Sequence, residues 1–557
     1  MAAMATPNST TTTTTTPTTI LTGSTYRLAV QNQQKQLDEQ IELGIYKPLF
    51  VYHFVLYIFL PLIGLLIPPN KRWSKFAQWS IFAIIFAIGS EIILYRRALF
   101  FAGGIATGIV TSWWIVWSAT LLIFNSSQRD FKRIERANHE ENSAIDGAGK
   151  KSDDQQQRRQ QQQREVLIWR SYPKSFSNRL NWCLDLLFNF RGPEWNWRSS
   201  SFGYIPESVC IQLGIPIKKQ AAELKSAEQK NNKNQTSPWK ASLRTLTISY
   251  ITLDILKTIM MRDLYFWGNL QAPPPYPFNI FSEYPLLIRL YREIFCATGI
   301  AIALIAITSL NPIIFQGISI ILPNLSRKIS PIPLEQSWLY SPGFGPFLES
   351  IKELGMAGVW GQWWHQMFRF GFLSSAHAIL NLLPMKLARN VYIRRTVQFF
   401  TAFIISAVMH ALGSYAQPAP TDPIRGPFMF FILQLVGIIL QESAKFVLVS
   451  IARSLRSSSS PSPSPSSPHK HHLQSPFPRW LGRSTNLIFT CFWLLAWGYT
   501  IADDFTISGL WLTEFVPVSL LRGLGLGLEG QGWWCAQEPM FRYWTDGTFW
   551  GSGLRVL

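Results

Sequence analysis

Apolar runs of about 20 residues alternate with polar segments along this chain of 557 residues. A helix needs about 20 mostly apolar residues to cross a bilayer. The runs fall near 48–67, 77–95, 101–124, 244–261, 294–322, 397–416, 427–451 and 485–502. A weaker, amphipathic run covers 355–383, and Pro312 interrupts the fifth run, which predicts a kinked or broken helix there. The pattern predicts an all-α, multi-pass transmembrane helical bundle with about eight to ten spans.

The polar segments divide the chain into regions with different expected order. The regions are a polar, disordered tail over 1–47, the first transmembrane helices over 48–124, a polar insert over 125–243, a transmembrane core over 244–453, a Ser/Pro/His-rich disordered loop over 454–478, and a C-terminal transmembrane helix and tail over 479–557. The insert contains Gln-rich and Lys/Asn-rich tracts that cannot bury enough apolar surface to fold, so it is expected to be largely disordered. Inside it, Leu180, Leu184 and Leu187 recur at helical spacing and predict an amphipathic helix near 179–197 on the membrane surface.

The amino-acid composition supports a membrane location. Only 15% of the residues are charged, against about 25% in soluble domains, and the chain holds 23 Trp and 38 Phe. The net charge of +19 comes from basic residues in loops beside apolar runs, such as Lys71 and Arg72, which is typical of cytoplasmic loops. Nucleic-acid binding is therefore disfavoured. If loop 68–76 and the insert are cytoplasmic, the N-terminus is lumenal, although Arg96 and Arg97 count against this orientation.

His410 lies inside the apolar run 397–416. Burying an imidazole in a membrane helix is costly, so an intramembrane histidine is a functional candidate. A neutral imidazole can take a proton from an alcohol, and an ordinary pKa near 6.5 suits general-base catalysis at neutral pH. The residues alone leave two interpretations open: a catalytic base, or a histidine that is hydrogen-bonded to a neighbouring helix.

A tryptophan-rich segment carries a second histidine candidate. It runs Trp360-Gly361-Gln362-Trp363-Trp364-His365-Gln366, and Arg369 follows it. In a continuous helix, Arg369 lies one turn after His365 on the same face. With Trp364 and Gln366 beside it, this pair could hold an anionic or carbonyl group of a substrate. The alternative is an aromatic belt at the membrane interface with an arginine that extends toward water.

Other polar residues in the apolar runs are further candidates. Asp254 could line a substrate path or join two helices by hydrogen bonds. The same alternatives hold for Gln441 and Glu442, with helix joining favoured for Glu442. His377 is interpreted as a packing or loop-facing residue.

Several other site types are disfavoured. The five cysteines are far apart and form no CxxC pair, so neither a disulfide framework nor a zinc site is expected. The tract with His469, His471 and His472 lies in the loop expected to be disordered, and no metal is expected there. The chain has no GxSxG elbow, P-loop or dinucleotide-binding GxGxxG motif, which weighs against a hydrolase or a nucleotide-driven pump.

Four segments between residues 45 and 510 carry a family resemblance. They are Phe124 to Arg133, Asn189 to Trp197, Tyr250 to Asp263, and Trp360 to Gln366 followed by Ser406 and His410. In order and spacing they resemble the wax synthase branch of the membrane-bound O-acyltransferase superfamily, particularly its filamentous-fungal members. The Trp-His-Gln element with a downstream intramembrane histidine is the most specific of the four.

The resemblance implies transfer of an acyl group from acyl-CoA to an alcohol, with no metal and no tightly bound cofactor. It also implies that His410 is the catalytic base and that His365 helps to shape the reaction centre. Fungal relatives often acetylate terpenoid or meroterpenoid secondary metabolites. Acetyl-CoA and a lipophilic alcohol are therefore the expected substrates, and the endoplasmic reticulum membrane is the expected location.

The chain departs from the usual pattern of the family just before His365. That pattern is close to Phe-Trp-Gly-Arg-Arg-Trp-His-Gln, whereas here Val359 replaces the Phe, and Gln362 and Trp363 replace the two Arg. The change removes cations that could hold CoA phosphates, and it keeps a non-catalytic relative open as an interpretation. Two more alternatives are a long-chain acyltransferase that forms wax esters or acylates diacylglycerol, and a transporter with a pathway lined by histidines. The transporter is disfavoured because no internal repeat is present.

Overall fold

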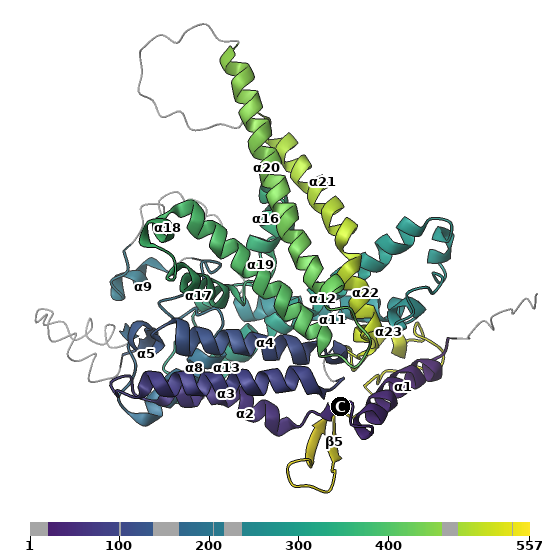
Figure 1. Cartoon of the computed structure of the whole chain (residues 1–557), viewed down its shortest axis with the longest axis horizontal. Helices are drawn as coiled ribbons and strands as arrows, with labels where there is room; N and C mark the ends of the chain where they lie inside the picture. The colour runs from purple at the N-terminus through teal and green to yellow at the C-terminus, as the bar shows by residue number, and fades with distance from the viewer. Residues whose placement is uncertain are drawn as a thin grey trace, which may run out of the picture.

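The computed structural model describes residues 21–99, 102–137, 166–203, 205–216, 237–458, 477–536 and 539–557. Helices dominate these residues, and the strands among them form three two-stranded sheets. Figure 1 shows the helices gathered in one bundle, with α20 and α21 extending from it side by side. The expected all-α, multi-pass membrane class is confirmed.

The elements follow one another in this order. The helices up to residue 260 are α1 (Gly23–Glu42), α2 (Val51–Leu66), α3 (Ser74–Tyr95), α4 (Ile105–Ala119), α5 (Ser127–Asp130), α8 (Phe176–Phe188), α9 (Glu207–Gln212) and α11 (Pro238–Met260). The later helices are α12 (Pro285–Asn311), α13 (Gly317–Ile321), α14 (Pro323–Ile329), α15 (Phe347–Leu354), α16 (Met356–Gly358), α17 (Arg369–Leu380), α18 (Met385–Arg389), α19 (Val391–Tyr415), α20 (Met429–Ser458), α21 (Arg479–Trp497), α22 (Tyr499–Ile507) and α23 (Leu520–Gly523). Four π-helical turns are η2 (Thr120–Phe124), η5 (Pro312–Gln316), η7 (Val359–Trp363) and η8 (Ile424–Phe428). Strands β1 (Lys47–Pro48) and β2 (Arg96–Arg97) form a parallel pair. Strand β3 (Arg133–Arg136) pairs antiparallel with β4 (Leu167–Arg170), and β5 (Phe541–Trp544) pairs antiparallel with β6 (Gly553–Val556).

Six of the described helices are long and apolar enough to cross a membrane, fewer than the eight to ten spans expected. They are Ser74–Tyr95, Ile105–Phe124, Pro285–Ile321, Val391–Tyr415, Ile424–Leu455 and Arg479–Ile507. The run at 48–67 forms α2, which is apolar but only 16 residues long. The run at 244–261 forms α11, a helix of 23 residues whose apolar surface is interrupted by charged side chains. The amphipathic run 355–383 breaks into separate pieces.

Pro312 kinks the third of these spans without ending it. Proline has no N–H to donate and crowds the preceding turn of a helix. Helix α12 therefore gives way to the π-helical turn η5, and helical structure continues into α13.

The polar insert is folded in the parts that the structure describes, which corrects the expectation of a largely disordered segment. Helix α8 matches the expected amphipathic helix but buries Trp182, Cys183, Leu186 and Leu187 and packs against α2. One face of the helix therefore belongs to the protein core, and its place on the membrane surface stays a prediction. Helix α1 likewise lies within the region expected to be a disordered tail. The Gln-rich tract, the Lys/Asn-rich tract and the histidine-rich tract lie outside the described residues.

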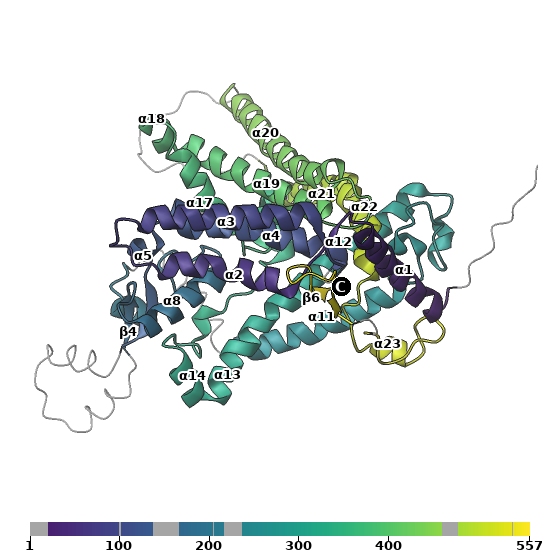
Figure 2. The ribbon, with the colours of Figure 1, turned by 60° about the horizontal axis from the view of Figure 1, so that its bottom comes forward.

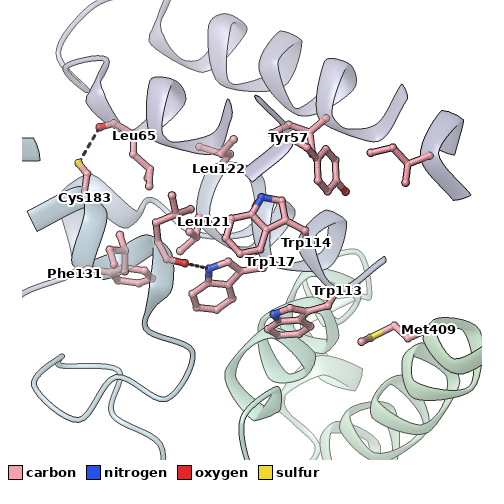
Figure 3. Close-up of a cluster of buried hydrophobic side chains, with 14 of the residues drawn as sticks. Tyr57, Leu65, Trp113, Trp114, Trp117, Leu121, Leu122, Phe131, Cys183 and Met409 are labelled. Carbon is pink, nitrogen blue, oxygen red and sulfur yellow. Dashed lines mark hydrogen bonds between the residues drawn. The ribbon is translucent and has the colours of Figure 1, made fainter. Parts of the chain in front are cut away.

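The largest hydrophobic cluster lies between the first transmembrane helices and α8 (Figure 3). Trp117 of α4 is fully buried in it, and its indole N–H donates to the carbonyl of Leu187 at 2.8 Å. Met409 of α19 joins the same cluster from the other side, next to Trp113. Because Met409 precedes His410, this cluster anchors the part of α19 that carries the histidine.

Helices α4 and α19 also meet at backbone distance. A Cβ on Gly108 would overlap the carbonyl of Leu412, so only glycine allows this approach. Small residues that let backbones touch are a common device in membrane helix packing. The contact lies two residues beyond His410 and fixes how far α19 is inserted into the bundle.

Candidate active site

Helix α19 presents His410 with a defined tautomer. The Asn390 side chain caps the helix by accepting from the backbone N–H of Tyr392 at 2.9 Å. Further along, His410 Nδ1 lies 2.8 Å from the Ser406 carbonyl oxygen. A carbonyl can only accept, so Nδ1 carries the proton and donates it. In the neutral ring, Nε2 is then the nitrogen that can accept a proton.

The segment with His365 is a broken helix. Helix α15 ends at Gly355, which has a φ of 64°, and α16 passes into the π-helical turn η7. Trp364 is extended, with φ −59° and ψ 146°, and α17 begins only at Arg369. His365 therefore lies between two helices, and the expectation that His365 and Arg369 share one helical face is wrong.

His365 is surrounded by aromatic rings. Its ring centroid lies 5.2 Å from those of Trp364 and Phe368 and 6.0 Å from that of Phe344. Its Nδ1 is buried and has no hydrogen-bond partner within the part of the chain that the structure describes. Burial lowers the pKa of His365 below its ordinary value, and the nearby His410 adds to the shift. His365 is therefore neutral at physiological pH and has an unused polar atom.

One cavity of about 360 Å³ joins the two histidines. Phe431 of α20 also lines it, with its ring centroid 4.3 Å from that of His410. Helix α19 contributes a continuous stripe to the wall: Arg395, Gln398, Phe399, Ala402, Phe403, Ser406 and His410. This stripe follows helical spacing over 15 residues, so the cavity extends about 22 Å along the helix axis.

The predicted residues around His365 also belong to this cavity, and two of them stabilise the break. Trp364, Gln366 and Arg369 all line it. The Gln366 side-chain amide donates to the Trp364 carbonyl at 2.6 Å, and Arg369 donates to Gln366 Oε1 at 2.9 Å. The structure thus brings five of the six predicted site residues together. Some of the hydrogen bonds that Gln366 and Arg369 can make are formed within the protein and are not available to a substrate.

Asp254 is the predicted site residue that lies elsewhere. It is 2% exposed, and it accepts hydrogen bonds from the Ser519 hydroxyl and from the Leu521 N–H. Arg522 lies 4.0 Å from its carboxylate. Asp254 therefore joins α11 to α23, and the expectation of a substrate-binding role is corrected to helix joining. Gln441 acts in the same way, since it accepts from the Met356 N–H and donates to Asn486.

The sequence interpretation missed the outer end of the cavity. Arg395 lines it there, and Lys386, Arg389 and Arg394 lie close by along the chain, on α18 and the first turn of α19. These four exposed cations have no hydrogen bond or ion pair from their side chains within the described residues. The sequence between Glu353 and Asp422 contains no acidic residue, which was the available signal.

The candidate site shows no cluster of metal-ligating side chains. Among the described residues, no group of three or more His, Cys, Asp or Glu side chains could hold a metal ion. A base, a second neutral imidazole and a cationic entrance suit acyl transfer from an activated, negatively charged donor to a hydroxyl group.

Comparison with known proteins agrees with this geometry. Residues 340–433 match the model described as the membrane bound O-acyl transferase family. The resemblance to membrane-bound O-acyltransferases is confirmed. The matched residues include both histidines, the broken helix between them and the α18–α19 corner.

Curated relatives are named as acyl-transferring proteins of fungi. The acetyltransferase fsoF of Humicola fuscoatra is 28% identical over 178 residues, which cover 32% of this chain and 38% of the relative. The O-mevalon transferase macI of Penicillium terrestre is 24% identical over 287 residues, covering 49% of this chain and 55% of the relative. The acetyltransferase spyB of Aspergillus fumigatus is 26% identical over 101 residues, covering 18% and 17%. The matches thus span between 17% and 55% of the relatives' own lengths. No solved structure matches the chain.

Proposed function

We propose that this multi-pass membrane protein is an acyl-CoA-dependent O-acyltransferase. The observation that carries the proposal is the single cavity with an unprotonated nitrogen of His410 at one end and, at the other, Arg395, whose side chain has no partner among the described residues. The match to the O-acyltransferase family over the same residues supports it.

In the proposed reaction, His410 is the base and His365 assists. Nε2 of His410 takes the proton of the acceptor hydroxyl while the oxygen attacks the thioester carbonyl carbon. His365, neutral and with an unused ring nitrogen, donates a hydrogen bond to the oxyanion that develops. The carbon–sulfur bond then breaks, the CoA sulfur receives the proton from His410, and ester and CoA leave. The aromatic walls exclude the water that would hydrolyse the thioester.

The charge distribution favours acyl-CoA as the donor. The pantetheine arm from sulfur to phosphate has as many backbone bonds as four to five residues and reaches about 15 Å when extended. The stripe on α19 runs about 22 Å from Arg395 to His410, enough to hold this arm once both side chains reach inward. The cations of the α18–α19 corner then face the CoA phosphates, in place of the two arginines that Gln362 and Trp363 replace.

The acceptor is proposed to be a lipophilic alcohol, and the group transferred to be acetyl. Phe399, Phe403 and Phe431 give the inner cavity an apolar wall that suits a terpenoid or meroterpenoid. Two of the three relatives described above are named acetyltransferases, which favours acetyl over long-chain acyl groups. The endoplasmic reticulum membrane is the proposed location, since it gives access both to cytosolic CoA esters and to membrane-dissolved alcohols.

The test uses microsomes that contain the protein, with radiolabelled acetyl-CoA or palmitoyl-CoA and a panel of terpenoid and fatty alcohols. Ester formation should fall by about 10²–10⁴ in His410→Ala, which loses the base. It should fall by about 10²–10³ in His365→Ala, which loses an oxyanion donor. His377→Ala is the matched control, because this exposed histidine does not line the cavity.

The result separates the remaining interpretations. Equal ester formation by the parent and by His410→Ala at equal abundance would contradict the proposed mechanism. A preference for palmitoyl-CoA with a fatty alcohol would indicate a wax-ester synthase. Uptake of an alcohol without consumption of either CoA ester would favour a transporter.

A further inference from the structure

A second, basic cavity lies at the α2–α3 loop, apart from the cavity that holds the histidines. It has a volume of about 230 Å³ and is lined by cations from two segments, Lys71, Arg72 and Lys75 from the loop and the start of α3, and Arg129 from α5. The rest of the wall consists of serine, asparagine and glutamine side chains with Pro69. Among the described residues, no carboxylate lines it. Its described wall therefore carries a net positive charge that no lining carboxylate balances.

Most of these cations are free to bind a ligand. Lys71, Arg72 and Lys75 are exposed, and their side chains have no hydrogen bond or ion pair within the described part of the chain. Arg129 is held in place by donating to the Pro69 carbonyl at 3.1 Å. The first turn of α3 has no side-chain cap, so the positive end of its helix dipole also faces this region.

A buried side-chain oxygen in the same wall has no hydrogen-bond donor among the described residues. Gln78 is 4% exposed, and its amide nitrogen donates to Gln128 Oε1 at 3.2 Å. Gln128 is oriented by donating to the carbonyls of Leu65 and Ile67, both at 2.6 Å. This arrangement leaves Gln78 Oε1 buried without a donor in the part of the chain that the structure describes. Such an atom suits a hydroxyl group beside the anion, because buried polar atoms rarely stay unpaired.

The side chains beside the cavity are of the kind found at the depth of lipid headgroups. Three aromatic side chains of the same loop and helix are exposed: Trp73 at 54%, Phe76 at 76% and Trp79 at 56%. Exposed aromatic residues at the end of an apolar span are typical of the membrane–water interface. The loop lies at the same end of the molecule as α5 and α18 in both views (Figures 1 and 2).

We propose that this cavity binds the headgroup of an anionic phospholipid, with the phosphate between Lys71, Arg72, Lys75 and Arg129. A phosphate accepts several charge-assisted hydrogen bonds from Lys and Arg. A zwitterionic lipid would bring a quaternary ammonium into a wall that offers it no carboxylate. The site is independent of the acyl-transfer chemistry proposed for His410, and its test does not require activity.

The test titrates purified full-length protein in mild detergent with short-chain phosphatidic acid, phosphatidylinositol or phosphatidylcholine, and follows bound lipid by native mass spectrometry. The parent should bind the two anionic lipids at least ten-fold more tightly than phosphatidylcholine. Lys71→Gln/Arg72→Gln/Lys75→Gln should lose that preference, since each of these cations attracts the anionic headgroup. Lys71→Arg/Lys75→Arg should keep it and shows that the loop still folds.

The control and a competition arm make the outcome decisive. Lys386→Gln/Arg389→Gln/Arg394→Gln removes the same charge at the same end of the molecule and should retain the preference. Equal losses in the two triple variants would show diffuse attraction and would overturn the site. Binding of inorganic phosphate in the α2–α3 cavity without any preference for anionic lipid would overturn the lipid as its occupant. No difference between the lipids in the parent would overturn the proposal outright.

Discussion

At the scale of single residues, the two histidines differ in how the protein hydrogen-bonds their ring nitrogens. His410 places one ring nitrogen on the Ser406 carbonyl of its own helix and thereby frees the other. His365 has a buried Nδ1 that no described residue bonds, which is uncommon unless a ligand completes the site. The first arrangement suits a base and the second suits a hydrogen-bond donor to a transient oxyanion.

His365 should make the folded protein sensitive to acid. Its pKa is lowered in the fold, so below about pH 6.5 the unfolded chain binds a proton that the folded protein does not. The free energy of unfolding therefore falls as the pH falls below about 6.5, by at most about 1.4 kcal/mol per pH unit for this group, and the contribution is fully present above that pH. The thermal midpoint of His365→Gln in detergent should change less than that of the parent between about pH 7.5 and about pH 5.

His377→Gln provides the comparison for this measurement, because it also removes a histidine but an exposed one. It should keep the acid sensitivity of the parent. If the parent and His365→Gln lose stability in parallel, the proton that destabilises the fold binds elsewhere.

At the scale of elements, the break between η7 and α17 creates the site. In a straight helix over residues 355–383, the side chains after Trp364 would be distributed around the helix axis. The extended Trp364 instead sets His365 among aromatic rings on the cavity wall. Two glycines permit the bend, Gly355 through its positive φ and Gly358 through close contact with the Ser350 carbonyl.

Gly358→Ala should damage this element. The new Cβ would overlap the Ser350 carbonyl, so α15 and α16 must move apart. We expect a loss of about 1–3 kcal/mol in stability together with reduced ester formation. Gly482→Ala on α21 is the matched control, because nothing lies within 4 Å of its added Cβ and it does not line the cavity. Gly358→Ala should unfold at a lower temperature than the control and form less ester. If the two variants behave alike, the contact between Gly358 and the Ser350 carbonyl limits neither stability nor activity.

The α18–α19 corner should control the affinity for the donor. Arg394→Gln/Arg395→Gln removes two cations that lie far from the reacting atoms. The KM for acetyl-CoA should rise roughly ten-fold while kcat changes little, because the lost binding is the same in the ground and transition states. Lys240→Gln/Arg244→Gln on α11 removes equal charge away from the cavity lining and should leave KM unchanged. A fall in kcat alone would place these arginines in a different role.

At the scale of the whole molecule, several cations that have no partner among the described residues lie at one end. Lys71, Arg72 and Lys75 lie at the start of α3, and α18 lies at the same end (Figures 1 and 2). Arg96 and Arg97, which follow the other end of α3, are engaged with Glu91 and with backbone carbonyls. From the positive-inside rule we predict that this end faces the cytosol, from which the proposed acyl-CoA donor would enter.

This orientation can be tested by cysteine labelling in sealed microsomes. Arg389→Cys on α18 should react with a membrane-impermeant maleimide added outside, which corresponds to the cytosolic face. Phe549→Cys should react only after permeabilisation, since β6 bonds to Leu49 beside β1 and β2, at the far end of α3. The parent chain would carry Ser in place of Cys210, Cys491 and Cys535. The reverse labelling pattern would show that the molecule has the opposite orientation in the membrane. The α18–α19 corner would then lie on the lumenal side, away from cytosolic CoA.

Much of the site could be predicted from the sequence because its signals are local. A histidine in an apolar run and the Trp-His-Gln element are each visible within a few residues, and both line the cavity. Asp254 gave an equally local signal but bonds to Ser519, which is distant in sequence. Its partner could not be predicted without knowing that α11 packs against α23.

By itself, the sequence determined that this is a helical membrane protein with two histidines that stand out from their surroundings. Run length, composition and the cost of burying an imidazole are properties of short segments, so they need no knowledge of the fold. Only the tertiary structure decided that the helix breaks before Arg369 and that Arg395 and His410 are the two ends of one cavity. It also decided that the loop at Lys71 forms a separate basic cavity with Arg129. Those features depend on which distant segments pack together, and packing is decided by the whole chain at once.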